Sequence, residues 1–183
     1  MKLSELLRYQ SKLDQAVMEL MNNKMNPSSL FLARKMALIC EYYEFLNETK
    51  LFKYWNDKEI NLEKLKEEYI DIVHFTLSLC LIYGLEELAD DCKLGISEEE
   101  QLSNRYVEAR SDEKMRTQLL NIKFDWMEGI FKAIEPQNFS EWLGWIKTMS
   151  LFLALTGKEI RERYLLKWEL NFRRLGLEPS DVN

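Results

Sequence analysis

Two pairs of acidic residues in helical stretches constrain the fold of this chain most strongly. Glu41 and Glu44 stand three residues apart in one stretch, and Glu48 continues their acidic stripe four residues later. Glu68 and Asp71 stand three apart in the next stretch. Residues three apart share one face of a helix, so two antiparallel helices would bring the four carboxylates together on facing surfaces. Glu68 and Asp71 also lie in a largely apolar run, where an unpaired carboxylate is costly to bury. The pattern predicts packed helices whose acids are neutralised by cations.

The rest of the chain follows a helical pattern as well. Three prolines and six glycines in 183 residues leave little turn chemistry for a β-rich fold. Apolar spacing predicts helices over 2–23, from a cap at Ser28 or Ser29 to Glu48, from Leu62 to near Gly84, and over about 112–134, 139–156 and 158–175. The acidic segment 85–111 is expected to be a mobile connection or small lobe. We therefore expect an all-α fold with a single domain over 1–183: a helical bundle of antiparallel helices plus a smaller mobile helical lobe.

Charge and composition exclude several classes of protein. The net charge of −6 argues against stable nucleic-acid binding, which needs a basic surface. No apolar run reaches the roughly 18 residues of a membrane span, and the charged amino terminus lacks the apolar centre of a signal peptide. Cys40, Cys80 and Cys92 have no zinc-type spacing and are expected to be buried or half-buried free thiols. A cytoplasmic protein is expected.

The types of candidate ligand narrow the metal and its chemistry. Carboxylate oxygens, with one histidine in the whole chain, suit Mg²⁺ or Mn²⁺ better than zinc or copper. A di-iron site would need two Glu-x-x-His pairs, and only Asp71 and His74 have that spacing. Magnesium ions on carboxylates usually bind substrate phosphates and can activate water. The residues indicate metal-dependent hydrolysis of a phosphoanhydride, with Lys50 and Lys53 near the phosphates; the alternative is a solvated acidic face.

The central residues resemble a known family. MALICEYYEFLNETKLFKYW followed by EEYIDIVHF is similar to the signature of the dimeric all-α dUTPases, relatives of the MazG-type nucleotide pyrophosphatases. The shared pattern is ExxE, an FKxW-like element, and ExxD with histidine three residues later. The resemblance implies that two or three Mg²⁺ ions, or Mn²⁺, bind to Glu41, Glu44, Glu68 and Asp71. These four acids, together with Glu48, are the candidate catalytic residues.

Further positions resemble the family's substrate-binding elements. Gln10 and Asp14 match polar contacts to the uracil ring, although the family often has Asn where Asp14 stands. Near the carboxyl terminus, RYLLKWELNFRRLG resembles a YxxKNxxNxxR element that closes over the nucleotide, with Trp168 in place of the usual Asn. The residues that the resemblance assigns to substrate binding are Gln10, Asp14, Asn47, Lys53, Trp55, His74, Tyr164, Lys167, Asn171 and Arg174.

The resemblance implies a homodimeric dUTP diphosphatase that converts dUTP, and also dUDP, to dUMP and so limits uracil in DNA. Two alternatives stay open: a related pyrophosphatase acting on dCTP or a modified nucleotide, and a non-catalytic helical interaction protein. Individual residues also have structural interpretations. His74 is either a core histidine or a hydrogen-bond partner of Asp71, and Lys167 and Arg174 suit a helix end. Trp126, Trp142 and Trp145 are expected in the core or a dimer interface.

Overall fold

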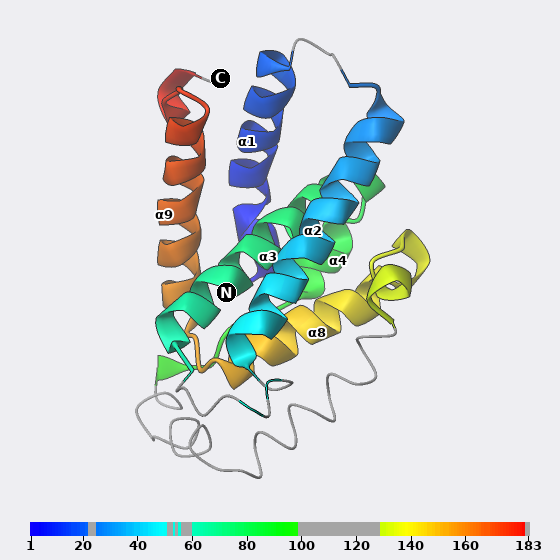
Figure 1. Cartoon of the computed structure of the whole chain (residues 1–183). Coiled ribbons are helices and arrows are strands. Elements are labelled where there is room, and N and C mark those ends of the chain that lie inside the picture. Colours follow the sequence, from blue (N-terminus) through cyan, green and yellow to red (C-terminus); the bar gives the residue numbers. More distant parts are fainter. Residues whose placement is uncertain (22–24, 51–52, 54, 56–59, 99–128, 182–183) are drawn as a thin grey trace.

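The computed structural model describes residues 1–21, 25–50, 53, 55, 60–98 and 129–181 and shows an all-α fold (Figure 1). Within these residues there is no β-strand; two isolated bridges, Lys2 to Lys93 and Ile96 to Thr156, are the sole β contacts. The predicted fold class is therefore confirmed. The longer helices are α1 (Leu7–Leu20), α2 (Pro27–Thr49), α3 (Leu62–Tyr83), α8 (Phe139–Phe152) and α9 (Gly157–Arg174). Shorter ones are η1 (Leu3–Leu6), α4 (Glu86–Asp91), η2 (Pro136–Asn138) and η3 (Pro179–Asp181).

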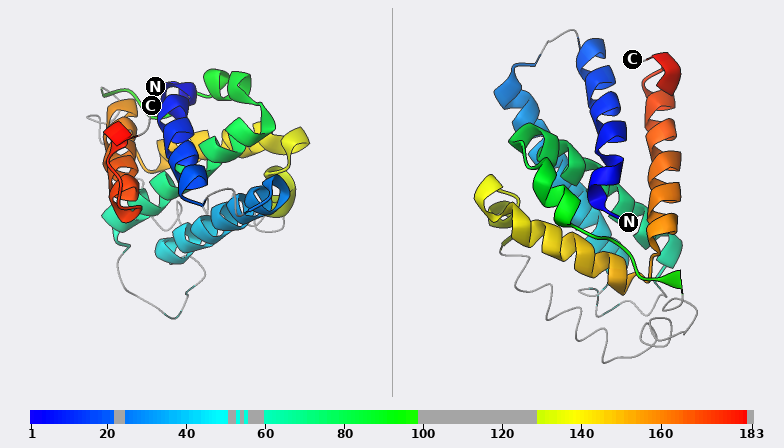
Figure 2. Two further views of the ribbon diagram at one scale, coloured as in Figure 1. Left: turned by 90° about the horizontal axis from the view of Figure 1, so that it is seen from above. Right: turned by 180° about the vertical axis from the view of Figure 1, so that it is seen from behind.

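Helices α2 and α3 form the antiparallel pair on which the other elements pack (Figures 1 and 2). α2 begins after Asn26, whose side chain accepts a hydrogen bond from the Ser29 backbone N–H. The predicted cap at Ser28 or Ser29 is thus wrong, because Pro27 occupies the first helical turn, where its missing N–H costs nothing. α3 begins after Asn61, an equivalent cap, and ends at Gly84, whose φ of 67° favours glycine.

Helices α1 and α9 contact each other and both contact α3 (Figure 2). α9 begins with a capping box in which Thr156 and Glu159 exchange hydrogen bonds. Because Thr156 caps α9, the helix predicted to reach 156 ends instead at Phe152, and Ala154 turns the chain with a φ of 48°. These boundaries set α9 beside α3, and therefore close to the acids on it.

Helix α8 covers the other side of the α2/α3 pair with a cluster of aromatic rings. Trp142 and Trp145 are buried and stacked, with ring centroids 4.9 Å apart, and both pack edge-on against Tyr42. Trp142 Nε1 also donates a hydrogen bond to the Thr76 hydroxyl of α3. These two tryptophans are core residues, whereas Trp126 lies outside the described residues. The cluster holds α2 and α3 at a fixed spacing.

Other sequence predictions have mixed outcomes. The described part of segment 85–111 contains α4 and packs on the core through Ala89, Leu94 and Ile96. Most of the helix predicted over 112–134 lies outside the description, and its last part, 129–133, is helical. The three cysteines are free as predicted, but Cys40 is exposed rather than buried. No helix among the described residues is long and apolar enough to cross a membrane.

Candidate active site

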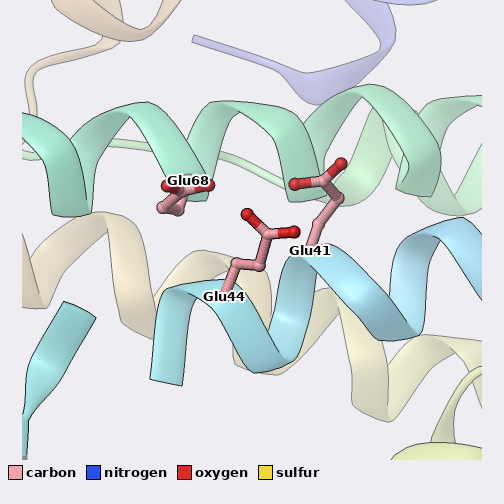
Figure 3. A group of neighbouring side chains, drawn as sticks. All are labelled: Glu41, Glu44 and Glu68. Carbon is pink, nitrogen blue, oxygen red and sulfur yellow. The ribbon is translucent and has the colours of Figure 1, made fainter. Parts of the chain in front are cut away.

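Three of the four predicted metal-binding acids meet between α2 and α3. Glu41 and Glu44 of α2 and Glu68 of α3 each offer a carboxylate oxygen, and these atoms all lie within 4.8 Å of one another (Figure 3). The convergence follows from the antiparallel packing, which turns the acidic face of each helix toward the other. We call these residues the acid cluster. Its oxygen donors are those that Mg²⁺ and Mn²⁺ prefer.

The acid cluster carries more negative charge than its surroundings neutralise. Burial, helped by the charges of Asp71, Glu44 and Glu68, raises the pKa of Glu41 to about 7. Burial and neighbouring Asp71 also raise the pKa of Glu68. Burial and the repulsion among these acids therefore disfavour the ionised carboxylates, although Lys167 and Lys64 partly oppose the two shifts. The residues therefore fit a divalent cation, which would supply the missing positive charge.

Asp71, the fourth predicted ligand, has a different partner in this structure. Its Oδ2 accepts a hydrogen bond from Lys167 Nζ of α9 at 2.6 Å, and each side chain is only 13% exposed. Lys167 also lies 3.4 Å from Glu67 Oε1. Burial raises the pKa of Asp71, and the lysine opposes that shift. Asp71 thus stands beside the acid cluster with its charge compensated by α9.

Glu48, predicted to continue the same acidic stripe, also has a cation of its own. The side chain is largely buried, and Oε1 accepts a hydrogen bond from Lys64 Nζ at 2.7 Å. Asn47 Nδ2 lies 3.5 Å from the same oxygen. The stripe predicted from spacing therefore divides: Glu41 and Glu44 join Glu68, whereas Glu48 pairs with Lys64.

A pocket of about 310 Å³ adjoins Glu41 and Asp71 and is bounded by α1, α2, α3 and α9. It brings together residues that lie far apart in the sequence, including both ends of the chain. The predicted residues that line it are Gln10, Asp14, Glu41, Asp71, His74, Lys167, Asn171 and Arg174. Leu13, Val17, Phe75 and Leu175 add apolar surface, and apolar walls with a few polar groups are typical of ligand sites.

One side of this pocket is held by hydrogen bonds centred on Gln10. Its Oε1 accepts from the Tyr164 hydroxyl at 2.8 Å and lies 3.0 Å from His74 Nδ1. The His74 and Tyr164 rings stack with centroids 3.9 Å apart. Burial lowers the pKa of His74 to about 3, so the ring is neutral. His74 therefore bonds to Gln10 rather than to Asp71, and among the described residues its Nε2 has no partner.

Asp14 continues these contacts to a residue that the sequence did not single out. Asp14 Oδ1 accepts from Gln10 Nε2 at 2.7 Å and from Arg34 of α2. Ser78 Oγ donates to Asp14 Oδ2 at 2.7 Å and accepts from Arg34. Arg34 is 8% exposed and lines the pocket. Arg34 lies two helical turns before Glu41 on the same face of α2, and this spacing in the sequence could have indicated that it faces the site. We call Gln10, Asp14, Arg34, His74, Ser78 and Tyr164 the polar network.

The remaining predicted binding residues lie apart from this pocket or at its edge. Asn47 is exposed at the end of α2, and Trp55 is 66% exposed; neither lines the pocket formed by the described residues. Lys53 is described, but its neighbours 51–52, 54 and 56–59 are not. Arg174 and Asn171 both line the pocket, and Arg174 Nη1 donates to Asn171 Oδ1 at 3.4 Å.

Trp168, which departs from the family pattern, performs a packing role. Its Nε1 donates to the Tyr9 carbonyl at 2.6 Å, and its ring packs edge-on against Tyr9 and Phe172. It is 8% exposed and does not line the pocket. The indole therefore joins α9 to α1 without changing the chemistry of the pocket wall.

Comparison with known proteins gives a family over nearly the whole length. Searches among curated proteins and among solved structures gave no match. The family model described as dUTPase matches residues 2–177, a range that includes the acid cluster, the polar network and α9. The chain therefore belongs to the all-α (type 2) dUTPase family.

Proposed function

We propose that this chain is a Mg²⁺-dependent dUTP diphosphatase that releases pyrophosphate from dUTP to give dUMP and also hydrolyses dUDP. Its cellular role would be to limit the incorporation of uracil into DNA. We also propose that the protein is cytoplasmic. The observation that carries the proposal is the position of the acid cluster beside a pocket that is lined on one side by the polar network. A nucleotide spanning the two would put its phosphates at the carboxylates and its base against the polar network.

Glu41, Glu44, Glu68 and Asp71 would hold two or three Mg²⁺ ions, with Mn²⁺ as a substitute. Bound there, the metal supplies charge neutralisation for the phosphates and activation of water. Glu44 is the acid of the cluster that is exposed, so we assign to it the acceptance of the proton from water. Glu48, held by Lys64, would position the end of α2.

Cations of α9 complete the phosphate side of the site. Lys167 lies at the boundary between Asp71 and the pocket, and Arg174 lies about two helical turns further along the same face of α9. With Asp71 as a metal ligand, Lys167 would be available to a phosphate oxygen, and Arg174 would add a second donor. Lys53, Trp55 and Asn47 stay predictions for contacts with the bound nucleotide.

The two alternative functions have less support than dUTP hydrolysis, and an exposed surface on α2 supports the expected homodimer. A tryptophan at position 168, where the family usually has Asn, is a reason to consider dCTP as the substrate, but the Trp168 side chain does not line the pocket. An acid cluster with too few counterions argues against a non-catalytic role. An exposed apolar stripe on α2, formed by Leu32, Met36 and Tyr43, offers a surface for the second subunit. We propose a homodimer on this basis.

Release of pyrophosphate tests the function directly. The purified chain with Mg²⁺ is incubated with dUTP, dUDP, dCTP, dTTP and UTP, and products are separated by chromatography. We expect dUMP from dUTP and dUDP, with pyrophosphate from dUTP alone. The absence of hydrolysis of every nucleotide would refute the enzyme, whereas preference for another base would refute only the substrate.

A further inference from the structure

We propose that Arg34 is a specificity-determining residue: with Asp14 and Gln10 it forms a row of hydrogen-bonding groups that matches the imide edge of uracil. This inference rests on the proposed function, because it concerns the base of the same nucleotide. It adds an assignment for a side chain contributed by α2, whereas Gln10 and Asp14 both belong to α1.

The row consists of a donor, an acceptor and a donor. Asp14 can only accept, and its Oδ1 already receives a hydrogen bond from Gln10 Nε2 and another from Arg34. The amide nitrogen of Gln10 has a second N–H, and the guanidinium of Arg34 has further N–H groups beyond Nη1. All three side chains line the pocket. A ligand there meets a carboxylate flanked by two donors.

The polarity of this row is fixed by its surroundings. In the structure, the Tyr164 hydroxyl donates to the Gln10 amide oxygen, and the Gln10 amide nitrogen donates to Asp14. Rotation of the amide by half a turn would point its oxygen at the Asp14 carboxylate and its NH₂ group at the Tyr164 hydroxyl. Arg34 cannot become an acceptor, and Ser78 holds both Arg34 and Asp14 from the side. An isolated amide can turn to suit either kind of ligand edge, whereas an aspartate–arginine pair cannot.

This polarity distinguishes the pyrimidine bases. The imide edge of uracil presents a carbonyl, an N–H and a second carbonyl, which complement a donor, an acceptor and a donor. Cytosine presents a carbonyl, a ring nitrogen lone pair and an amino group, so its lone pair would face the Asp14 carboxylate and its amino group would face a donor. Buried polar groups left unpaired in this way are the strongest basis of discrimination. Thymine shares the imide edge, so the row does not separate it from uracil.

A purely structural role for Arg34 predicts a different pattern of effects. If Arg34 only braced α1 against α2, its loss would weaken all nucleotides equally. If it contacts the base, its loss changes the ratio of kcat/KM for dUTP to that for dCTP. The ratio is therefore the decisive quantity, and the absolute rates are secondary.

The experiment compares wild type with three variants of the full chain in the presence of Mg²⁺. The double variant Arg34→Met with Asp14→Asn removes both charges and leaves an amide that can turn; we expect its dUTP/dCTP ratio to fall by about 10- to 100-fold, mainly through KM for dUTP. Arg34→Lys keeps a cationic donor and should keep most of the preference. Arg163→Met removes a cation that pairs with exposed Glu63 and lies outside the pocket, so it should leave the ratio unchanged.

Calorimetric binding of dUMP and of dCMP to the same proteins provides a measurement independent of turnover. A wild-type ratio in the double variant, in both assays, would overturn the role of Arg34 while leaving dUTP hydrolysis intact. Selective dUMP binding that depends on Arg34, without any hydrolysis of dUTP, would support the role and refute the proposed function. Equal affinity of the wild type for dUMP and dCMP, with equal rates on their triphosphates, would overturn the inference.

Discussion

The acid cluster and the polar network are neighbours with opposite balances of charge. In the polar network, Asp14 accepts hydrogen bonds from Arg34, Ser78 and Gln10, so both of its carboxylate oxygens have partners. In the acid cluster, Glu41, Glu44 and Glu68 face one another, and the pKa of Glu41 rises to about 7. The two regions share α2 and α3, so the difference lies in the side chains rather than in the fold.

The difference separates contacts that the folded chain makes without a ligand from charges that a bound ligand must compensate. A satisfied network holds its groups in one arrangement before a ligand arrives, which suits recognition of a rigid base. An uncompensated cluster favours the arrival of cations. Asp71 lies between these cases, since Lys167 compensates its charge from α9. Substitutions in the two regions should consequently affect stability and activity in opposite ways.

The largest effect is expected from Glu68→Ala. This change removes a proposed metal ligand from the cluster, and a bound metal would contribute several kcal/mol of charge stabilisation, so pyrophosphate release from dUTP should fall by at least about 10³-fold. Far-UV circular dichroism should be unchanged, because the variant reduces repulsion inside the fold. Glu63→Ala on the same helix is the matched control, since Glu63 is exposed and pairs with Arg163. Activity close to wild type in Glu68→Ala would refute the metal site.

The next effect is on stability and comes from the polar network. Arg34→Met leaves the partly buried Asp14 side chain, which is 17% exposed, without its counterion, so the free energy of unfolding should fall by about 3 kcal/mol. Arg163→Met removes a cation from an exposed acid, Glu63, and should cost no more than about 1 kcal/mol. Urea unfolding followed by tryptophan fluorescence measures both. Equal losses in the two variants would show that the network is no more than a surface arrangement.

Much of the fold was predictable because its signals are local. Apolar periodicity located α2, α3 and α9 to within a few residues, and Gly84 ended α3 as expected. The meeting of Glu41, Glu44 and Glu68 also followed from local spacing, given two antiparallel helices. These features depend on neighbouring residues in one helix, which sequence patterns report directly.

The partners of the charged groups were not predictable, because they depend on how helices are rotated against each other. Lys167 is 96 residues from Asp71, and no local pattern in either stretch indicates that the two side chains pair. Arg34 has the pattern of a solvated cation near the start of a helix, yet α1 covers it with Asp14. Trp168 occupies a position that the family pattern assigns to the nucleotide, but the packing of Tyr9 turns it toward α1.

The smallest predicted effect concerns pH. The carboxyl of Glu41 has a pKa of about 7 in the folded chain against 4.5 for an ordinary glutamate, so between these values the folded state binds more protons than the unfolded state. Stability in the absence of divalent metal should therefore decrease as pH rises from about 4.5 to about 7, with no further contribution from this group above that range.

Glu41→Gln tests this direction, since the amide cannot ionise and removes one of the facing charges. At pH 8 with EDTA the variant should melt roughly 2–6 °C above wild type, a shift that corresponds to one or two kcal/mol in a chain of this size. At pH 5 the two proteins should melt together, because Glu41 is then protonated in the folded wild type. Saturating Mg²⁺ should raise the melting temperature of the wild type at pH 8 more than that of the variant, because the ion replaces the missing counterions of the acid cluster. Differential scanning calorimetry measures all three comparisons, and a variant less stable than wild type at pH 8 would show that Glu41 is already compensated.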